Sequence, residues 1–558
     1  MKTELELFIQ KAAVENALKF EGKANPKALI GKVVGAFSQT KNDMPALVSQ
    51  ITKIVSHINQ LSTSEQEALL AQLGGPSEKK KKSEGLKELT DAKPGNVIMR
   101  FAPSPSGPMH IGHAITGGLT SAYVQKYGGK FIFRIEDTNS ENIYEPAYDM
   151  LVEDANWLFE NVHEVIIQSQ RMELYYTYAK KLLESNHLYV DTSSSEEFAI
   201  CAEKQIDPQS KSLPASQHLK LFEQMLDGTI KQGEAVVRFK GDMKHKNPAM
   251  RDFPLFRIQE TPHPKTKTTY RVWPLMNFSV FVDDVELGMT HIIRAKDHAD
   301  NAKRQELLYE AIGKKPPISY FTGRYKFTDL ELSSTKTKQK IEEGIYSGWD
   351  DIRLPTIRSL QRRGFQPQAF LAFTKGVGLT SVDKVVDKQE FFKNIESYNV
   401  QIIDPIAKRF FFIQEPIQLP VSLSQTVELD IHPQKHKGGR TLTVSDSVYI
   451  ESKDEHLFQK GIVRLIDFCN ISKEGVHSQT YEDYKSVDVK AGIIHWLPAD
   501  ESQLTTISVH MPDGSIVSGL CEKHIETITI GDIVQFERFG FCRLDSIQDG
   551  VYTFWFTQ

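Results

Sequence analysis

Cysteine is scarce in this sequence of 558 residues, and long apolar runs are absent. The four cysteines, Cys201, Cys469, Cys521 and Cys542, include no pair at CxxC spacing, so we expect neither a protein-bound zinc ion nor a disulfide framework. No run of about 18 apolar residues is present to cross a bilayer. Acidic residues interrupt the first 20 positions, which argues against a secretory signal. We therefore expect a cytoplasmic protein without a membrane partner.

The sequence also lacks a strong charge of either sign. It contains 67 Lys and Arg residues against 72 Asp and Glu residues, a formal net charge of −5. This balance excludes a globally basic nucleic-acid-binding protein. It leaves RNA binding through local basic patches open, because affinity for phosphates depends on the local potential.

Residues 1–73 predict an N-terminal helical module. Five apolar residues recur at intervals of three and four positions and form one helical stripe: Leu47, Ile51, Ile54, Ile58 and Leu61. Ser64 followed by Glu67 predicts a capping box that opens another helix. Residues 74–95 contain four consecutive lysines and no apolar periodicity, which is typical of a linker.

After the linker the pattern changes to alternating strands and helices. Val97 to Ala102 predicts a strand, 111–127 a helix ended by Gly128, and Phe131 to Ile135 a second strand, which together form a βαβ unit. The remaining chain predicts five segments: 96–190 and 266–343 as two halves of an α/β domain, 191–265 as an insertion, 344–402 as a helical connector, and 403–558 as short strands that form β-barrels.

The segment RFAPSPSGPMHIGHA, Arg100 to Ala114, lies where a strand ends and a helix begins. Ligands bind at this position in α/β sheets, and a helix N-terminus attracts anions. Gly107 and Gly112 permit a close backbone approach, and His110 and His113 project from one side of the first helical turn. Two imidazoles can donate hydrogen bonds to the phosphate oxygens of a leaving pyrophosphate. A bare pair of nearby histidines would more often be incidental.

Two further segments contain candidate ligands for a charged substrate. Glu136 lies in FRIEDTN at the end of the second strand, whereas Asp137 there could simply cap the next turn. Arg294 ends the apolar run LGMTHIIR and needs an anionic partner to offset its desolvation. That partner is either a bound carboxylate or an internal acid, Asp283 or Asp284.

The whole chain resembles the glutamyl/glutaminyl subgroup of class I aminoacyl-tRNA synthetases, and in particular the archaeal-type glutamyl enzymes. The histidine segment resembles the HIGH signature of this class, with these flanking positions: Pro103, Ser104, Pro105, Ser106, Gly107, Pro108, Met109 and Ile111. LSSTKTKQKIEEGIYSGWDD resembles the lysine-bearing KMSKS loop. Ser334 occupies the place of the usual second lysine, so Lys336 or Lys338 is expected to contact the phosphates. The segment HPQKHKGGRTLTV resembles an anticodon-reading loop, in which Arg440 is a candidate base contact.

The resemblance implies a multidomain α/β plus β protein. Its Rossmann-like catalytic domain would contain an inserted acceptor-stem-binding domain, followed by a helical connector and C-terminal anticodon-binding β-barrels. It also implies that His110, Gly112, His113, Ser333, Ser334 and Lys336 bind ATP, and that Arg100, Glu136, Asn277 and Arg294 bind the amino acid. Mg²⁺ would accompany ATP, held largely by phosphates and water.

Glutamate is favoured over glutamine as the amino acid. Arg294 stands where glutaminyl enzymes resemble one another in having a small uncharged residue, and Met276-Asn277 replaces their Tyr-Asp pair. A fixed cation selects a carboxylate over its neutral isostere. The expected activity is therefore ATP-dependent glutamate–tRNA ligation on tRNA(Glu), with tRNA(Gln) as a further substrate left open.

Other functions stay open at this point. A glutaminyl enzyme would use the same fold, and a small-molecule nucleotidyltransferase would use the same histidines without needing the connector and barrels. Ser334 also admits a catalytically silent tRNA-binding relative. The N-terminal helical module is expected to bind an accessory protein or another synthetase.

Overall fold

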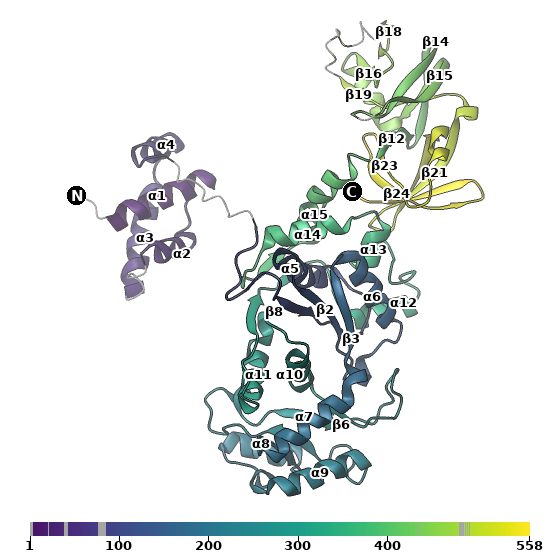
Figure 1. Cartoon of the computed structure of the whole chain (residues 1–558). Coiled ribbons are helices and arrows are strands. Elements are labelled where there is room, and N and C mark those ends of the chain that lie inside the picture. Colours follow the sequence, from purple (N-terminus) through teal and green to yellow (C-terminus); the bar gives the residue numbers. More distant parts are fainter. Residues whose placement is uncertain are drawn as a thin grey trace. The chain divides into compact units, whose positions relative to one another are not determined.

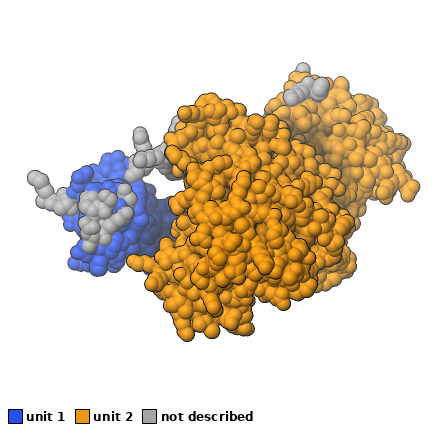
Figure 2. Space-filling model, turned by 60° about the horizontal axis from the view of Figure 1, so that its bottom comes forward, with its two compact units in different colours: residues 1–84 blue, residues 85–558 orange. Residues whose placement is uncertain are grey.

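The computed structural model describes residues 4–20, 22–37, 43–75, 85–434, 436–478 and 491–558, together with 485, 487 and 489. The chain divides into two compact units, residues 1–84 and 85–558 (Figure 2). No helix within the described ranges combines the length and the apolar character that a bilayer crossing requires.

The first unit is a small helical module with its own core, as the sequence predicts (Figure 1). It consists of α1 (Glu4–Lys19), α2 (Pro26–Ala36), α3 (Met44–Ile58) and α4 (Thr63–Gln72). Leu47, Ile51 and Ile58 of the apolar stripe are fully buried between these helices, whereas Ile54 and Leu61 are half-buried at the edge of the stripe.

The predicted capping box of α4 is shifted by two residues. Ser62 caps the helix, and the carboxylate of Glu65 accepts from the Ser62 backbone N–H at 2.8 Å. The sequence contains a serine followed three positions later by a glutamate at both 62/65 and 64/67, so spacing alone does not distinguish the two. Because Ser62 and not Ser64 caps α4, Gln66 and Leu70 face the core of the module. Their burial decides which serine caps the helix.

Only part of the predicted linker lies among the described residues, since 76–84 fall outside them. Residues 85–95 pack onto the second unit instead of connecting freely. Leu89 is buried in the core of that unit, and its backbone N–H donates to the Tyr127 hydroxyl at 2.9 Å. The Thr90 carbonyl accepts from the His291 ring at 2.8 Å. The second unit therefore begins about ten residues before the predicted boundary.

The second unit is organised around a parallel sheet. β1 (Ile98–Phe101) pairs with β2 (Lys130–Ile135), which pairs with β3 (Val162–Ile167), and β8 (His291–Ala295) pairs with β9 (Ile318–Thr322). The Thr290 N–H, just before β8, donates to the Ile98 carbonyl at 3.0 Å, so the two strand groups meet along β1. The carboxyl ends of β1, β2 and β8 therefore lie together.

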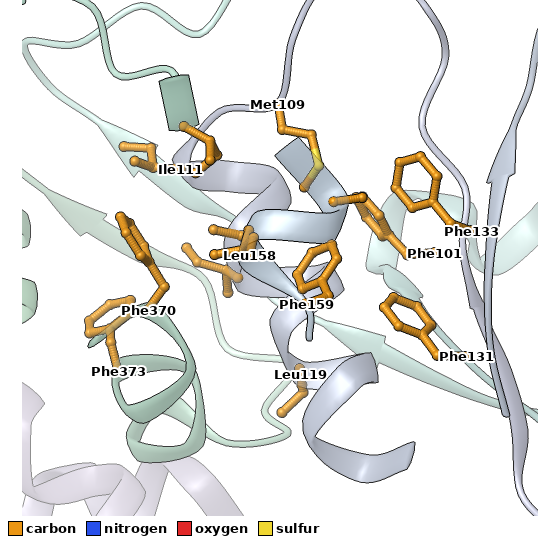
Figure 3. Packing of buried hydrophobic residues seen from close by; sticks show 14 of the residues in the cluster. Phe101, Met109, Ile111, Leu119, Phe131, Phe133, Leu158, Phe159, Phe370 and Phe373 are labelled. Carbon is orange, nitrogen blue, oxygen red and sulfur yellow. The ribbon is translucent and has the colours of Figure 1, made fainter. Parts of the chain in front are cut away.

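Helix α5 (Ile111–Tyr127) follows β1 and packs into the core with α6 (Ala147–Leu158). Figure 3 shows Phe101, Phe131, Phe133 and Phe159 clustered beside this helix. Gly128 ends α5 at φ 66°, a conformation that favours glycine. A Cβ on Gly129 would lie 1.8 Å from the Val97 carbonyl oxygen, so the return into β2 requires glycine there.

The insertion is an antiparallel sheet with helices that shares one core with the elements around it. It contains α7 (Met172–Glu184), β4 (Leu188–Asp191), α8 (Ser195–Lys204), α9 (Ala215–Asp227), β5 (Val236–Phe239), β6 (Pro254–Ile258) and β7 (Val272–Pro274). The four strands are neighbours in chain order. Since β7 completes the sheet, the predicted end of the insertion at residue 265 is too early. Helices α10 (Met276–Glu286) and α11 (Ala299–Ala311) close the same core.

The connector is helical with one short exception. It contains α13 (Ile357–Arg362), α14 (Pro367–Val377) and α15 (Lys388–Ile403), and it follows α12 (Ser334–Glu342). Strand β11 (Lys384–Val386) interrupts it because it pairs with β10 (Tyr325–Phe327) of the preceding segment. Phe370 and Phe373 of α14 reach the same core as α5 (Figure 3).

The described residues of the C-terminal part form mainly strands, with two separate cores. One seven-stranded sheet nearly closes, because the consecutive strands β12 (Lys408–Phe410) and β13 (Phe412–Ile413) lie at its opposite ends. Between them it holds β21 (Leu504–His510), β22 (Ile516–Glu522), β23 (Ile533–Phe536), β24 (Gly540–Gln548) and β25 (Val551–Phe556).

The other core lies under two smaller sheets. One contains the hairpin β14 (Pro416–His432) and β15 (His436–Glu451) with β20 (Leu497–Pro498). The second holds β16 (Val463–Leu465), β17 (Asn470–Ser472), β18 (Gly475–Ser478) and β19 (Gly492–Ile494). The prediction of short strands was wrong for β14 and β15, whose 17 and 16 residues form one long hairpin bent at two bulges.

Candidate active site

The first turn of α5 presents two stacked histidine rings. His110 is the N-cap residue, and its Nδ1 accepts from the Gly112 N–H at 3.1 Å. His113 Nδ1 accepts from the His110 N–H at 3.4 Å, and the two ring centroids are 3.8 Å apart. Since both Nδ1 atoms accept, the neutral rings carry their hydrogens on Nε2. The helix start therefore offers two N–H donors beside the positive end of its dipole.

Desolvation by the surrounding protein keeps both half-buried rings neutral. Desolvation lowers the pKa of His110 to about 4 and holds the pKa of His113 well below its ordinary value, with the neighbouring His110 ring as a second cause. The rings act as hydrogen-bond donors at neutral pH, and not as fixed cations.

The other residues of the histidine segment hold this turn in place. The Pro103 carbonyl accepts from the Glu136 N–H at 2.9 Å, and the Pro105 carbonyl accepts from the Tyr144 N–H at 2.8 Å. Met109 and Ile111 are buried in the core (Figure 3), and the Met109 N–H donates to the buried Asp154 carboxylate at 2.8 Å. The segment is thereby tied to the end of β2 on one side and to α6 on the other.

The serine- and lysine-bearing loop lies against the histidine segment. A Cβ on Gly107 would lie 3.1 Å from both the Ser334 hydroxyl and the Trp349 ring, so Gly107 permits this close approach. Ser333 caps α12, with its hydroxyl accepting from the Lys336 N–H at 3.4 Å. The two segments, more than 200 residues apart in the chain, therefore form one surface.

The two candidate lysines differ in their surroundings. The Lys336 side chain is 63% exposed and pairs with Glu331, and the Lys338 side chain is 44% exposed and lies 3.7 Å from Glu342. Lys338 lies over the Tyr144 ring, with Nζ 5.2 Å from its centroid, and lines a cavity of about 390 Å³. That cavity is also lined by Ser104 and Ser106 of the histidine segment. Of the two, Lys338 is the lysine that shares a cavity with the predicted ATP-binding loop.

A second cavity, of about 260 Å³, lies at the carboxyl ends of β1, β2 and β8. It brings together five of the predicted site residues from four segments: Arg100, Gly112, His113, Glu136 and Arg294. Its wall also contains residues that the sequence did not single out: Thr116, Val280, His298 and Gln305. We call this space the charged cavity.

Carboxylates neutralise two of the arginines around the charged cavity. Arg100 pairs with Asp284 through Nε and Nη2, at 3.0 and 3.3 Å. The fully buried Arg134 donates to Asp284 at 2.7 Å and to Glu136 at 3.0 Å. The two guanidinium groups hold the pKa of the Asp284 carboxyl below its usual range despite burial. The Glu136 carboxylate is thereby fixed at the cavity wall.

Arg294 does not have the internal carboxylate partner that the sequence left open. Asp283 and Asp284 pair with Arg171, Arg134 and Arg100 instead. The Arg294 Nη1 donates to the amide oxygen of Gln305 at 3.0 Å, and its buried Nε has no partner among the described residues. Desolvation, reinforced by Arg100, lowers the pKa of Arg294 to about 10. Within the described part of the chain, the guanidinium is therefore a buried cation that forms no salt bridge, with Asp284 and Glu136 acting on it only from a distance.

Asn277 and Arg440 lie away from free surfaces. Asn277 does not line the charged cavity, although its neighbour Met276 does, and its amide nitrogen is 3.2 Å from the Asn301 oxygen. The Arg440 side chain is 4% exposed and pairs with Glu522 at 2.6 Å inside the β region. A role of either residue in substrate binding stays a prediction.

Among the residues that the structure describes, no group of three or more His, Cys, Asp or Glu side chains is arranged to hold a metal ion. The carboxylate at the charged cavity, Glu136, is already paired with Arg134.

The fold and the site together define an α/β domain with a charged cavity at the carboxyl edge of its parallel sheet, and the family match places this domain in the class I tRNA synthetases. The pattern that describes the class I (E and Q) tRNA synthetase catalytic domain matches residues 96–403. Two anti-codon binding domain patterns of the same group match residues 407–491 and 493–545. The chain belongs to this E and Q family of class I tRNA synthetases.

Curated relatives match over nearly the full chain. A glutamate–tRNA ligase of Methanocaldococcus jannaschii is 41% identical, with 96% of each chain covered. The enzymes of the same name from Methanococcus maripaludis strain C7 and Methanobrevibacter smithii are 39% and 38% identical, with 98% and 99% of each chain covered. Among solved structures, a glutamate–tRNA synthetase from Elizabethkingia anophelis aligns at 19% identity and a TM-score of 0.41, covering 56% of this chain and 71% of that one.

Proposed function

We infer that the chain is a glutamate–tRNA ligase, which activates L-glutamate with ATP and transfers it to tRNA(Glu). The observation that carries this function is Arg294, a buried guanidinium at the charged cavity without a carboxylate partner among the described residues. A bound carboxylate supplies the missing anion. The relatives named glutamate–tRNA ligase, matched over 96% or more of this chain, support the same activity.

In this proposal the charged cavity holds the glutamate. Arg294 binds the side-chain carboxylate, Arg100 another part of the amino acid, and Glu136 the α-ammonium group. The three residues line one space of about 260 Å³, which suits a small amino acid. Asn277 is assigned a supporting role because Met276 beside it reaches the cavity.

ATP would lie along the start of α5, with the phosphates between the two histidines and the α12 loop. The Nε2–H groups of His110 and His113 donate to phosphate oxygens as negative charge moves onto the leaving pyrophosphate. Gly112 lets the nucleotide approach the helix. Ser333, Ser334 and a lysine, Lys336 or Lys338, complete the phosphate side. Mg²⁺ carried on the ATP phosphates would supply further charge neutralisation there.

The reaction then proceeds in two displacements. An α-carboxylate oxygen of glutamate attacks the α-phosphorus of ATP, the bond from that phosphorus to the bridging oxygen breaks, and pyrophosphate leaves. A hydroxyl of the terminal tRNA ribose attacks the carbonyl carbon of glutamyl-adenylate, and AMP leaves with the bonding electrons. The protein contributes positioning and charge stabilisation without forming a covalent bond to the substrate.

The remaining segments would bind the tRNA. The insertion between β4 and β7 is assigned to the acceptor stem, and the β region after residue 403 to the anticodon arm, with Arg440 as a candidate contact. Binding of tRNA(Glu) is expected to be required for activation, as the subgroup resemblance implies. The helical module of residues 1–73 is assigned to a protein partner, and we keep tRNA(Gln) as a possible second substrate.

The alternatives are weaker on the same observations. A glutaminyl enzyme would leave the Arg294 charge unpaired, because a carboxamide is neutral. A small-molecule nucleotidyltransferase would not need the two matched anticodon-binding regions. A silent relative would retain tRNA binding but lose pyrophosphate exchange.

The test is aminoacylation with ATP, Mg²⁺ and labelled glutamate or glutamine, using tRNA(Glu) and tRNA(Gln) separately. We expect glutamate charging of tRNA(Glu), and Arg294→Ala should lower kcat/KM for glutamate on the order of 10²–10⁴-fold. Arg294→Lys keeps the charge but loses the bidentate geometry of the guanidinium. Its kcat/KM for glutamate should therefore lie between those of the wild type and Arg294→Ala. Glutamine charging by the wild type, or unchanged glutamate kinetics in Arg294→Ala, would reject the proposal.

A further inference from the structure

The charge balance around the charged cavity leaves one positive charge over. Four arginines, Arg100, Arg134, Arg171 and Arg294, meet three carboxylates, Glu136, Asp283 and Asp284. Four cations against three anions give a surplus of one. The pairing places this surplus on Arg294, because each of the other three arginines forms a salt bridge with at least one of the carboxylates.

What distinguishes Arg294 is the chemistry of its protein partner. Its guanidinium donates to the amide oxygen of Gln305 at 3.0 Å, whereas Arg100 and Arg134 donate to carboxylates. A neutral acceptor fixes the direction of a guanidinium without neutralising its charge. A carboxylate in the place of the Gln305 amide would orient the Arg294 guanidinium equally well, but it would also neutralise its charge.

Gln305 is itself buried and is held in one orientation. It lies on α11, is 5% exposed and lines the charged cavity. Because a guanidinium only donates, the amide oxygen must face Arg294, and the amide nitrogen must point elsewhere. That nitrogen is buried without a partner within the described part of the chain. Gln305 therefore contacts Arg294 only through its acceptor oxygen.

We propose that Gln305 is a specificity-determining residue for glutamate, which positions Arg294 through a neutral acceptor and so keeps its charge available to the substrate. Arg294 and Gln305 both line this end of the cavity, and Arg294 forms no salt bridge with any residue that the structure describes. A bound carboxylate neutralises the Arg294 charge that Gln305 leaves uncompensated, whereas a carboxamide, being neutral, does not. The inference rests on the proposed glutamate–tRNA ligase activity and concerns how that site rejects glutamine.

The test compares two substitutions of similar size, of which one introduces a negative charge and the other is neutral. Gln305→Glu supplies a carboxylate that pairs with Arg294, and Gln305→Met removes the acceptor but keeps the volume. Lys303→Gln, on an exposed position of α11, changes the net charge by the same amount as Gln305→Glu and serves as the control. Thermal unfolding first establishes that each full-length variant is as stable as the wild type. KM and kcat are then measured with tRNA(Glu), once with glutamate and once with glutamine.

We expect Gln305→Glu to raise KM for glutamate at least tenfold, with kcat within a few-fold, and to lower the preference for glutamate over glutamine at least tenfold. Gln305→Met should raise KM for glutamate without any gain for glutamine, and Lys303→Gln should match the wild type.

Two results would overturn the inference while leaving the enzyme activity in place. One is wild-type KM and wild-type preference in Gln305→Glu alongside a defective Arg294→Ala. The other is an identical loss in Gln305→Glu and Gln305→Met with no change in preference, which would make Gln305 a packing residue. Failure of the wild type to charge glutamate at all would instead reject the proposed function, and with it the inference.

Discussion

At the scale of single residues, the two histidines show how a helix start can fix a tautomer. Backbone N–H groups occupy both Nδ1 atoms, so the hydrogens lie on Nε2. Desolvation lowers the pKa of His110 to about 4. The protein therefore keeps two neutral donors at the site where a negative charge would develop.

The lowered pKa of these rings has a consequence for stability. In the unfolded chain a histidine takes up its proton near pH 6.5, whereas the folded chain resists protonation until about pH 4. The stabilisation is therefore present above pH 6.5 and is lost as the pH falls toward 4. When the pH falls from 7.5 to 5, the free energy of unfolding should decrease in both proteins. We expect this decrease to be about 1–2 kcal/mol smaller in His110→Asn than in the wild type. Denaturant titrations at both pH values measure this. The exposed His57→Asn is the control, and equal losses in all three proteins would contradict the expectation.

The two lysines of the α12 loop lead to a second prediction at this scale. Lys338 shares a cavity with Ser104 and Ser106, whereas Lys336 is exposed and paired with Glu331. We expect Lys338→Ala to lower the rate of tRNA-dependent pyrophosphate exchange by at least tenfold more than Lys336→Ala, because the lost charge faces the phosphates. The reverse order would show that the loop rearranges when ATP binds.

At the scale of elements, α5 is the helix whose packing sets the site. Its first turn carries both histidines, and its buried face contacts the phenylalanines of β1 and β2 and Phe159, which follows α6 (Figure 3). A Cβ on Gly117 would lie 2.4 Å from the Phe159 ring. Glycine is therefore required at this position by packing, and the helix cannot move away without moving the histidines.

The Gly117→Ala variant tests this packing. We expect it to lower the free energy of unfolding of the second unit by about 1–3 kcal/mol, since overpacking a core forces shifts in its neighbours. The matched control is Gly31→Ala in α2, where a Cβ would meet nothing within 4 Å. That change should stabilise its own helix by about 0.5–1 kcal/mol. Thermal unfolding of both variants distinguishes them, and wild-type stability in Gly117→Ala would contradict the packing argument.

Helix α13 links two segments that the sequence treats separately. Its Arg358 lies 3.2 Å from Asp154, the same carboxylate that accepts from Met109 before the histidines. Its Arg362 pairs with Asp545 of β24 at 2.7 Å, and the next residue, Arg363, donates to the Thr557 carbonyl at 2.9 Å. The connector thereby joins the nearly closed C-terminal sheet to the core beneath the candidate site.

At the scale of the whole molecule, the two units have independent hydrophobic cores. The core of residues 1–84 is formed by its own helices, and the candidate site lies entirely in residues 85–558. Ile51→Ala, at a fully buried position of α3, should therefore destabilise the first unit by about 2–5 kcal/mol. Far-UV circular dichroism should show an earlier partial transition, whereas pyrophosphate exchange at 25 °C should keep the wild-type rate. A parallel loss of exchange would show that the units depend on each other.

The sequence by itself determined the order of the segments and the local signals. The strand, the loop with its prolines and serines, and the helix from Ile98 to Tyr127 follow from short-range patterns, and so does the end of α5 at Gly128. Five of the predicted site residues lie at the charged cavity because strand ends in a parallel sheet meet at one edge. Full-length similarity to the E and Q synthetases confirmed the family that these motifs indicated.

The tertiary structure alone decided which charges cancel. Asp283 and Asp284 were possible partners of Arg294 on sequence spacing, but the fold pairs them with Arg171, Arg134 and Arg100. Gln305 could not be singled out, because its contact with Arg294 depends on how α11 packs beside β8. The end of the insertion at β7 and the burial of Arg440 likewise depend on pairing between distant strands and on ion pairs that no local pattern encodes. Local sequence sets the type of each element, whereas electrostatic neutrality is a property of the assembled site.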